Sequence, residues 1–339
     1  MTNSRRTYLD LTYNKTNVTE ELGEHLKNWT FTDNLSGQID DLQITLEDVE
    51  HKWLANWFPT KGSLLEGVIL KKNWDDNPIK TRIGKFEVDE IDVKSPPSEV
   101  TIKALSVPES SSIRGEFKSK GWEKTTLKVV AGDIAKKNGL SLYYQASENP
   151  KKDRYEQESE TDLSFLYRLC SDEGFCLKLS NNSIVILDEA DYEIKDAVAT
   201  INRESKENDE IQMINWQART TLNGTYKSAR LQYHDSGKKK TIKASFVPPQ
   251  SPKVGRVLVL KEQVKSVAEG KRLCKKKLRE ANKDATTVSL TVVTERHLDA
   301  GMTLNLNMFG KFDGKYIITQ ATHSQTTVSL QLRRCLEGY

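Results

Sequence analysis

The stretch "YEQESETDLSFLYRLCSDEGF" (Tyr155–Phe175) is the most organised short passage of the chain, because acidic residues surround a regular run of apolar ones. The apolar residues recur every three or four positions, as on the buried face of an amphipathic helix. We therefore expect a helix here, and its apolar stripe should consist of Leu163, Leu166, Tyr167 and Cys170.

Both ends of this helix carry recognisable signals. Ser159 is the expected N-cap, with Asp162 three residues further on in the manner of a capping box. Gly174 stands where a left-handed C-cap is needed. Two strands at 175–180 and 183–188 follow, joined by a pair of asparagines, so the passage predicts a compact unit of one helix and one hairpin.

Six carboxylates in and around the same stretch allow two interpretations. A pair of them could act as general acid and base, as in a glycosidase. Alternatively, they cap and solvate a helix start, where the macrodipole favours negative charge. Glu158 and Glu160 have no Gly-rich, Trp-lined groove sequence beside them, so we favour capping. The residues concerned are Glu156, Glu158, Glu160, Asp162, Asp172 and Glu173.

The sequence before this unit is strand-like. Apolar and polar residues alternate at 9–13, 42–46 and 100–104, which predicts strands with one buried and one solvated face. The segment 47–58 has the spacing of a short helix with its tryptophans on one side. Two further strands linked through the Pro-Pro pair at 96–97 complete what we expect to be a small barrel or curled sheet.

The remaining segments divide into an α/β part and a second strand-rich part. Helical spacing at 125–138, stopped by Gly139, precedes a short strand. Beyond a charged, exposed connection at 202–210, strands lead to a long helix over about 261–281, and four alternating strands finish the chain.

These patterns predict an α+β fold that is mainly β, with two strand-rich, barrel-like domains flanking a smaller α/β middle domain. We place the amino-terminal domain at 1–107, the middle domain at 108–200 and the carboxy-terminal domain, with its one long helix, at 201–339.

Composition limits the class of protein. Among 339 residues, 29% are charged and 8% aromatic, and the formal net charge is +3, which describes a globular protein and not a disordered or strongly basic one. No C-x-x-C occurs among the four cysteines, so neither a disulfide framework nor a thiolate zinc site is indicated.

The start lacks a signal peptide's apolar region of about 7 to 15 residues. No apolar run approaches the roughly 18 residues of a membrane span, so we expect synthesis in a reducing cytoplasm without membrane insertion.

Motifs of known catalytic or cofactor chemistry are missing from the sequence. No G-x-S-x-G, G-x-x-x-x-G-K-[ST] or G-x-G-x-x-G is present. The histidines show no local metal-ligand spacing, although ligands assembled from distant positions stay possible. We therefore predict no catalytic, cofactor-binding or metal-binding residue. The five histidines are His25, His51, His234, His297 and His323.

A basic run at 271–280 is a candidate partner contact, because six cations fall within about two and a half helical turns. We favour a solvated helix face, since an apolar stripe remains to pack inward, and the alternatives are a contact with an acidic protein or with nucleic acid. An acidic partner is favoured over nucleic acid, because no aromatic residues are interleaved for base stacking. The six candidates are Lys271, Arg272, Lys275, Lys276, Lys277 and Arg279.

The opening stretch closely resembles the pattern Q-x-x-E-S-D-L-x-F-L-x-R-L-A-x-E-x-G of the phage late control gene D family. It departs from that pattern at Glu160-Thr161, where the family is often tighter, and at Cys170, which replaces a small residue. The matching positions are Gln157, Ser159, Asp162, Leu163, Phe165, Leu166, Arg168, Leu169, Glu173 and Gly174.

Further blocks resemble hub proteins of Gram-positive contractile-tailed prophages and R-type bacteriocins, in the same order and over most of the chain. They include "GKFEVDEIDV", "VTIKALSVPESSSIRGEF" and "AGMTLNLNMFGKFDGKYIITQATHSQ". The sequence does not distinguish a DNA-packaging phage from a headless bacteriocin.

The resemblance implies a structural baseplate hub without catalytic residues. Such hubs form a homotrimeric ring at the distal end of the tail tube. Two related barrel-like domains per chain present a pseudo-sixfold surface to the hexameric tube, and the trimeric central spike docks below. The implied partners are the tail tube protein, the central spike protein, the tape-measure protein and baseplate wedge or adaptor proteins. The implied location is the tail of a particle made in a bacterial host.

Two rival functions remain at the level of sequence. A tail-associated peptidoglycan hydrolase would need a site assembled from separated Cys, His or Glu residues, and it should release muropeptides from cell walls. A receptor-binding module at the tail tip would suit the strand-rich ends of the chain, and it should bind bacterial surfaces directly.

Overall fold

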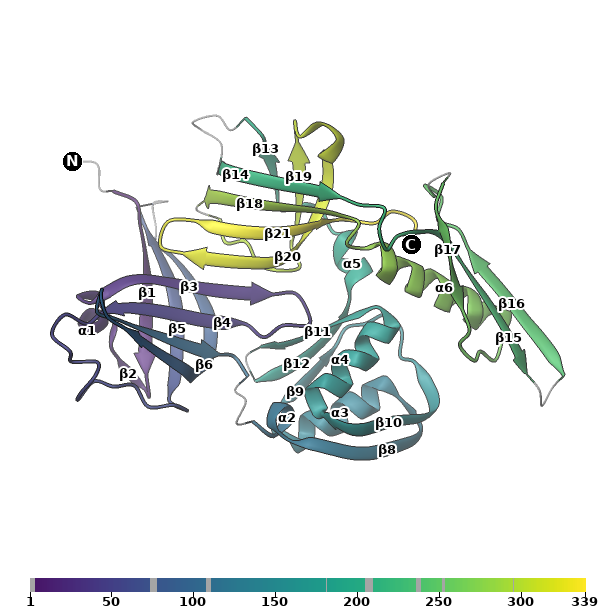
Figure 1. The fold of residues 1–339 in the computed structure, drawn as a ribbon, viewed down its shortest axis with the longest axis horizontal. Coiled ribbons are helices and arrows are strands. Elements are labelled where there is room, and N and C mark those ends of the chain that lie inside the picture. Colours follow the sequence, from purple (N-terminus) through teal and green to yellow (C-terminus); the bar gives the residue numbers. More distant parts are fainter. Residues whose placement is uncertain are drawn as a thin grey trace.

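The computed structural model describes residues 4–73, 78–107, 111–180, 182–204, 210–235, 239–251, 254–294 and 296–339. It is mainly β, as the alternating sequence predicts, and two barrel-like sheets lie next to each other with a helix-containing unit beside them (Figure 1). None of the helices in these ranges combines the length and apolar character that crossing a membrane requires.

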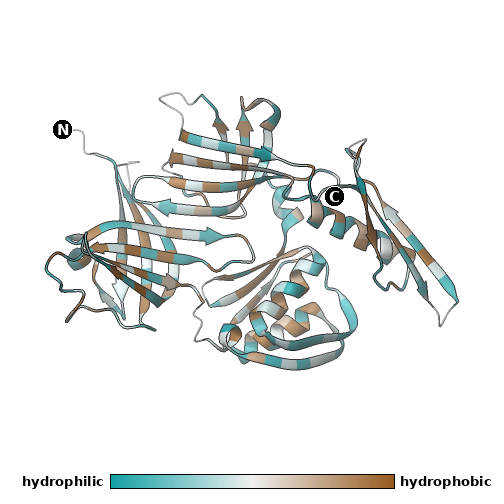
Figure 2. Cartoon of the chain, viewed as in Figure 1, coloured by the Kyte–Doolittle hydropathy of each residue, from teal (hydrophilic) through white to brown (hydrophobic). Residues whose placement is uncertain are grey.

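The amino-terminal barrel buries the apolar residues that alternate along its strands. Apolar and polar bands follow each other along these strands (Figure 2), and Trp29, Leu42 and Leu46 are fully buried between them. Its elements are β1 (Arg6–Tyr13), β2 (Thr16–Asn17), α1 (Thr19–Gly23), β3 (Leu26–Asn34), β4 (Asp41–Glu47), β5 (Leu64–Lys72), β6 (Ile79–Lys94) and β7 (Glu99–Leu105).

The helix expected at 47–58 is wrong, because this segment forms a series of turns. The Asp48 carboxylate accepts a hydrogen bond from the backbone N–H of Trp53 at 3.0 Å, and His51 has a φ of 56°. A short acidic side chain that bonds nearby backbone in this way competes with helix formation. Trp53 and Trp57 pack edge-to-face against His25 instead of forming a helix face.

The middle unit contains the opening stretch. Strand β10 pairs antiparallel with β8, while β11 and β12 form the expected hairpin and β9 joins β12 in parallel. Helices α3 and α4 share one hydrophobic core with these strands. The elements are α2 (Ser112–Gly115), β8 (Phe117–Thr126), α3 (Leu127–Lys137), β9 (Ser141–Tyr144), β10 (Lys151–Thr161), α4 (Asp162–Glu173), β11 (Phe175–Ser180), β12 (Ser183–Asp188) and α5 (Glu189–Glu193).

The carboxy-terminal segment builds two separate sheets. The barrel-like sheet contains β13 (Ala199–Asn202), β14 (Ile211–Thr220), β18 (Thr286–Thr294), β19 (Thr303–Asn307), the 3-10 helix η1 (Gly310–Phe312), β20 (Gly314–Ser324) and β21 (Val328–Arg334). A smaller sheet inserted between β14 and β18 contains β15 (Tyr226–Asp235), β16 (Lys240–Phe246) and β17 (Arg256–Leu260).

The long helix α6 (Val267–Asn282) packs on this smaller sheet and not on the barrel. It starts six residues later than the spacing at 261 suggests, because Ser266 is its N-cap and accepts a hydrogen bond from the backbone N–H of Glu269. Cys274 and Leu278 are buried against the sheet.

The two barrels have the same strand order. In the first barrel the order is β3-β4-β7-β6-β5-β1, and in the second it is β14-β18-β21-β20-β19-β13. Even the bulges correspond: an extra residue lies at Lys27 in β3 and at Ile214 in β14, and another at Asp89 in β6 and at Thr319 in β20. One difference is that β1 runs antiparallel to β5, whereas β13 runs parallel to β19.

The barrels are joined edge to edge within the chain. The second half of β20 pairs antiparallel with the second half of β3, from Gln320 opposite Asn34 to Ser324 opposite Thr30. This contact merges both barrels into one 13-stranded sheet. The chain therefore contains one internal example of how a barrel of this kind binds another.

Candidate functional site

The acidic stretch is part strand and part helix, and this changes the roles of its residues. The capping box expected at Ser159 is wrong, because β10 continues to Thr161 and Ser159 sits in its bulge with a φ of 46°. The N-cap is Thr161, whose hydroxyl accepts a hydrogen bond from the backbone N–H of Ser164 at 3.2 Å. Gly174 is the left-handed C-cap that its position predicts, with a φ of 71°.

The predicted apolar stripe of α4 is correct at Leu166 and Cys170, both of which are fully buried. Tyr167, in contrast, is 44% exposed and lies over the turn at Gly37. The contact is close: a Cβ atom added to Gly37 would lie only 2.8 Å from the Tyr167 hydroxyl oxygen. Phe165 takes its place in the core, stacked on the ring of Trp122. The helix thus joins the middle unit to the first barrel through Tyr167.

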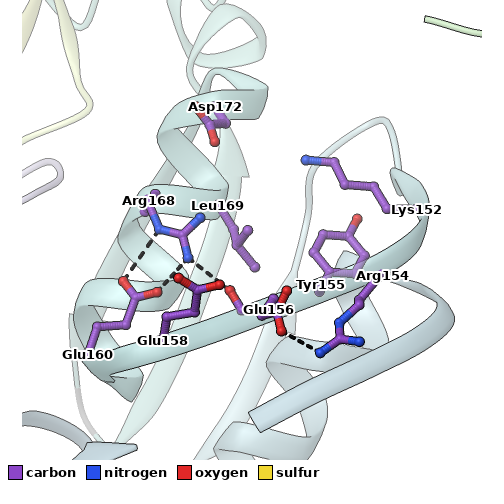
Figure 3. Close-up of a pocket in the computed structure, with 9 residues that line it drawn as sticks. All are labelled: Lys152, Arg154, Tyr155, Glu156, Glu158, Glu160, Arg168, Leu169 and Asp172. Carbon is purple, nitrogen blue, oxygen red and sulfur yellow. Dashed lines mark hydrogen bonds and ion pairs between the residues drawn. The ribbon is translucent and has the colours of Figure 1, made fainter. Parts of the chain in front are cut away.

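An open hollow of about 490 Å³ lies between β10 and α4 (Figure 3). Two of its four acids pair with cations that also line it: Glu160 forms an ion pair with Arg168, and Glu156 forms one with Arg154. Arg168 also donates to the backbone carbonyl of Glu156 at 3.0 Å, so it ties α4 to β10. The hydrogen bond that Arg168 donates to the Glu160 carboxylate raises the pKa of Arg168. The hollow is an ion-paired junction between two elements.

Asp162 is the acid of the motif that is most enclosed. Burial alone would raise the pKa of its carboxyl, but hydrogen bonds from Lys118, Gln157 and Asn138 outweigh burial and hold that pKa below its usual range. The Lys118 ammonium lies 2.7 Å away on β8. Asp162 therefore fastens the start of α4 to the paired strands β8 and β10.

The basic run of α6 faces carboxylates of the chain's own middle unit. Lys276 lies 2.7 Å from Glu148, which also pairs with Arg272, and Lys277 lies 2.8 Å from Asp172. The favoured acidic partner of these cations thus includes the same polypeptide. Lys271 and Lys275 differ, because both are exposed and form no ion pair with any residue that the structure describes.

Arg279 belongs to a buried charge network that the sequence did not reveal. Its guanidinium lies 2.6 Å from Glu193, and Arg333 on β21 lies 2.8 Å from Glu189 and also pairs with Glu193. Burial alone would lower the pKa of Arg333, but the charges of Glu189 and Glu193 outweigh it and raise that pKa. The two glutamates stand four residues apart on α5, and this spacing was the available signal. The network joins α5, α6 and the second barrel.

Two histidines from distant positions meet at the junction of the barrels. His297 lies 2.6 Å from Asp299, and its ring stacks on that of His323 with centroids 4.6 Å apart and an interplanar angle of 16°. The three side chains offer possible ligand atoms within 4.8 Å of one another. A metal ligated by both imidazoles should lie in both ring planes, and two stacked rings do not share such a point. The arrangement is that of packed rings.

Burial makes His323 a poor base. Its ring is 2% exposed, stacks on Phe31 of β3 and contacts the backbone carbonyl of Leu298 at 3.0 Å. Burial, followed by the proximity of His297, lowers the pKa of His323 to about 3. The histidine is therefore a neutral part of the contact between the barrels.

Comparisons with known proteins agree with this architecture. A family model described as phage tail baseplate hub (GPD) matches residues 90–328. A probable baseplate hub protein of Escherichia phage 186 is 29% identical over 183 residues, which cover 52% of this chain and 44% of the relative. The corresponding protein of Escherichia phage P2 is 30% identical over 161 residues, covering 46% and 39%. The match thus spans less than half the length of either relative.

Solved structures match the fold over nearly the whole chain. The prophage MuSo2 43 kDa tail protein from Shewanella oneidensis has a TM-score of 0.73 at 13% identity, covering 97% of this chain and 98% of its own. The tail protein from Neisseria meningitidis MC58 has a TM-score of 0.72 at 13% identity, covering 97% and 96%.

A more distant match is an E. coli component of the type VI secretion system. It is described as similar in structure to the T4 bacteriophage tail proteins gp27 and gp5, and it has a TM-score of 0.59 at 12% identity, covering 93% of this chain and 75% of its own. The family model covers more than half of the sequence, from within β6 of the first barrel to the start of the last strand, β21. The chain therefore belongs to the phage tail baseplate hub (GPD) family.

Proposed function

We propose that this protein is the structural hub of a contractile-tail baseplate, in which three copies form a ring between the tail tube and the central spike. The observation that carries this proposal is the repeated barrel. Two barrels with the same strand order and matching bulges are joined edge to edge in one chain. Three such chains would present six similar barrels, and this number suits a sixfold tube above and a threefold spike below.

The division of the chain supports the same role. Separate hydrophobic clusters occupy the first barrel, the middle unit and the second barrel. They support the proposed domains at 1–107, 108–200 and 201–339, with the β15–β17 sheet and α6 as a further body with its own core. We propose that the barrels form the ring and that the other two bodies lie outside it.

Partner contacts follow from this placement. Of the six cations of the basic run, Lys271 and Lys275 are exposed and have no ion-pair partner in the part of the chain that the structure describes, and we propose that they contact an acidic surface of a neighbouring baseplate protein. The tube, spike, tape-measure and wedge or adaptor proteins are the proposed partners, and the host is proposed to be Gram-positive. Synthesis in the host cytoplasm, without membrane insertion, is part of the proposal.

The experiment is co-assembly. The purified chain is mixed with the tail tube and central spike proteins of the same particle, and the mixture is separated by size-exclusion chromatography. We expect one species that contains all three proteins. Elution of the chain apart from both proteins, at concentrations well above micromolar, would contradict the proposed role.

A further inference from the structure

We propose that neighbouring copies of this chain bind through one specific strand pair, the second half of β6 in one copy and the second half of β14 in the next. This contact rests on the proposed ring and names its interface. It follows from the internal repeat, because the same contact already exists once within the chain.

The two strands have free edges where the proposal needs them. Strand β14 pairs with β18 on one side, and its residues 215–220 have no backbone ladder to any described strand on the other side. Strand β6 pairs with β5 only as far as Glu87, so beyond the bulge at Asp89 its edge on that side has no described ladder partner. Unpaired strand edges are templates for pairing with another chain.

The repeat identifies which strand such an edge accepts. By strand order and bulge position, β6 corresponds to β20 and β14 corresponds to β3. Within the chain, β20 uses its second half, beyond the bulge at Thr319, to pair with β3. Strand β6 offers an edge like that of β20, and strand β14 offers an edge like that of β3. Each barrel can therefore bind the next one around a ring by the same kind of strand pair.

The matched bulges also fix the register. In the intrachain contact His323 lies opposite Phe31, and counting from the bulges places Val93 of one copy opposite Ala218 of the next. Asp92, which lies 3.3 Å from Lys103 of its own chain, then lies opposite Arg219, so the register adds a guanidinium to this carboxylate across the interface. The full set of predicted opposite pairs is Glu90–Thr221, Ile91–Thr220, Asp92–Arg219, Val93–Ala218 and Lys94–Gln217.

Side-chain exposure differs between the paired edges of β3 and β20 and the corresponding edges of β14 and β6. Leu35, just after β3, is 5% exposed, whereas its counterpart Leu222, just after β14, is 78% exposed. His323 of β20 is 2% exposed, whereas its counterpart Val93 of β6 is 42% exposed. Leu222 and Val93 are thus exposed apolar side chains at positions whose counterparts are covered in the paired edge, as expected if another copy covers them.

Charge suits a pairing of unlike edges. Strand β14 contains no acidic residue between Ile211 and Thr220, while residues 89–94 of β6 include three acids and one lysine. Charged edges discourage unspecific strand pairing, and opposite charges directly across a ladder stabilise it. Because β6 binds β14 and not another β6, the contact is head-to-tail, and such contacts form rings when the rotation closes.

The test is a disulfide between copies. Two differently tagged chains are prepared, one with Val93→Cys and the other with Ala218→Cys, mixed under assembly conditions with the tube and spike proteins, and oxidised. Opposite residues of a ladder are close enough for a disulfide, so we expect a cross-linked pair carrying both tags. The matched control replaces Ala218→Cys by Gln217→Cys, whose side chain points to the other face of the sheet, and it should not cross-link.

A charge exchange gives a second readout. Asp92→Arg alone and Arg219→Asp alone should each raise the protein concentration needed for assembly by about fivefold, and the two changes together in one chain should restore it. If the wild type assembles but forms no mixed-tag disulfide and the charge variants are neutral, the strand pair is wrong while the hub role stands. If the wild type stays monomeric with tube and spike proteins present, both proposals fail.

Discussion

Leu166 shows at the scale of one residue what the acidic stretch is for. It is fully buried in the core of the middle unit. Leu166→Ala should lower the free energy of unfolding by about 2–5 kcal/mol, because it removes buried apolar surface and leaves a cavity. Urea unfolding followed by circular dichroism measures this loss.

The controls for Leu166 use residues of similar chemistry or sequence position. Leu54→Ala, at a leucine that is 53% exposed, should change the free energy of unfolding by less than about 0.5 kcal/mol. Glu158→Gln in the same motif should be equally small, since the side chain is exposed. A large loss in either control, or a negligible loss for Leu166→Ala, would contradict the assigned roles.

His323 should make stability depend on pH. Its pKa is about 3 in the folded chain, against an ordinary value near 6.5, so the unfolded chain binds the proton first as pH falls. The free energy of unfolding should therefore decrease from about pH 6.5 towards pH 3, by about 1.4 kcal/mol per pH unit from this group. Urea unfolding at pH 7, 6, 5 and 4 measures the slope.

Two glutamine variants isolate the contribution of His323. His323→Gln should flatten the slope between pH 6 and pH 4, whereas His234→Gln, at an exposed histidine of β15, should leave it unchanged. An unchanged slope in His323→Gln would mean that the imidazole is protonated in the folded chain near its ordinary pKa.

Helix α6 is the element whose charges serve two purposes. Lys276→Glu places a third carboxylate beside Glu148 and Glu173, and should lower the free energy of unfolding by about 1 kcal/mol or more, less so at high salt. Lys275→Glu, one residue away on the exposed face, should leave stability unchanged.

Binding to partner proteins should distinguish Lys275 from Lys276 in the opposite way to stability. If Lys275 contacts an acidic partner, Lys275→Glu should weaken binding of the tube, spike or neighbouring baseplate proteins without affecting the fold. Pull-down with each partner measures this binding. Equal binding by wild type and Lys275→Glu would leave α6 as a purely internal contact.

Elements with a clear period were predictable from the sequence, and those shaped by one local bond were not. Alternation placed β4, β7 and the four final strands, and Gly174 marked the end of α4. The turns at 47–58 were not predicted, because the Asp48 side chain replaces a helical hydrogen bond. The start of α4 was predicted wrongly, because pairing with β8 extends β10 to Thr161 and no local sequence pattern encodes such pairing.

Contacts between segments far apart in the chain were even harder to predict from the sequence. The pairing of β20 with β3 joins residues almost 300 positions apart, and period-two alternation states which face is buried but not which strand lies alongside. The sequence left the basic run either a solvated helix face or a candidate partner contact, and Glu148 and Asp172, which pair with its cations, became visible only in the folded chain. The repeated strand order appears only when both barrels are compared in three dimensions.

At the scale of the whole molecule, the chain is two similar barrels joined by one strand pair, with a helical unit and a small sheet attached. Among the described strands, the internal pairing of β3 with β20 leaves one edge of each type without a ladder partner, on β14 and on β6. A molecule with two complementary, unlike edges should associate head to tail, and a closed ring leaves no edge exposed.

The mass of the assembled hub tests this account most directly. Multi-angle light scattering on the purified chain, alone and in complex with the tube and spike proteins, gives the number of copies per particle. We expect a hub of three times the 38.5 kDa chain mass. A single copy of the chain per particle, with both partner proteins bound or present in excess, would contradict it.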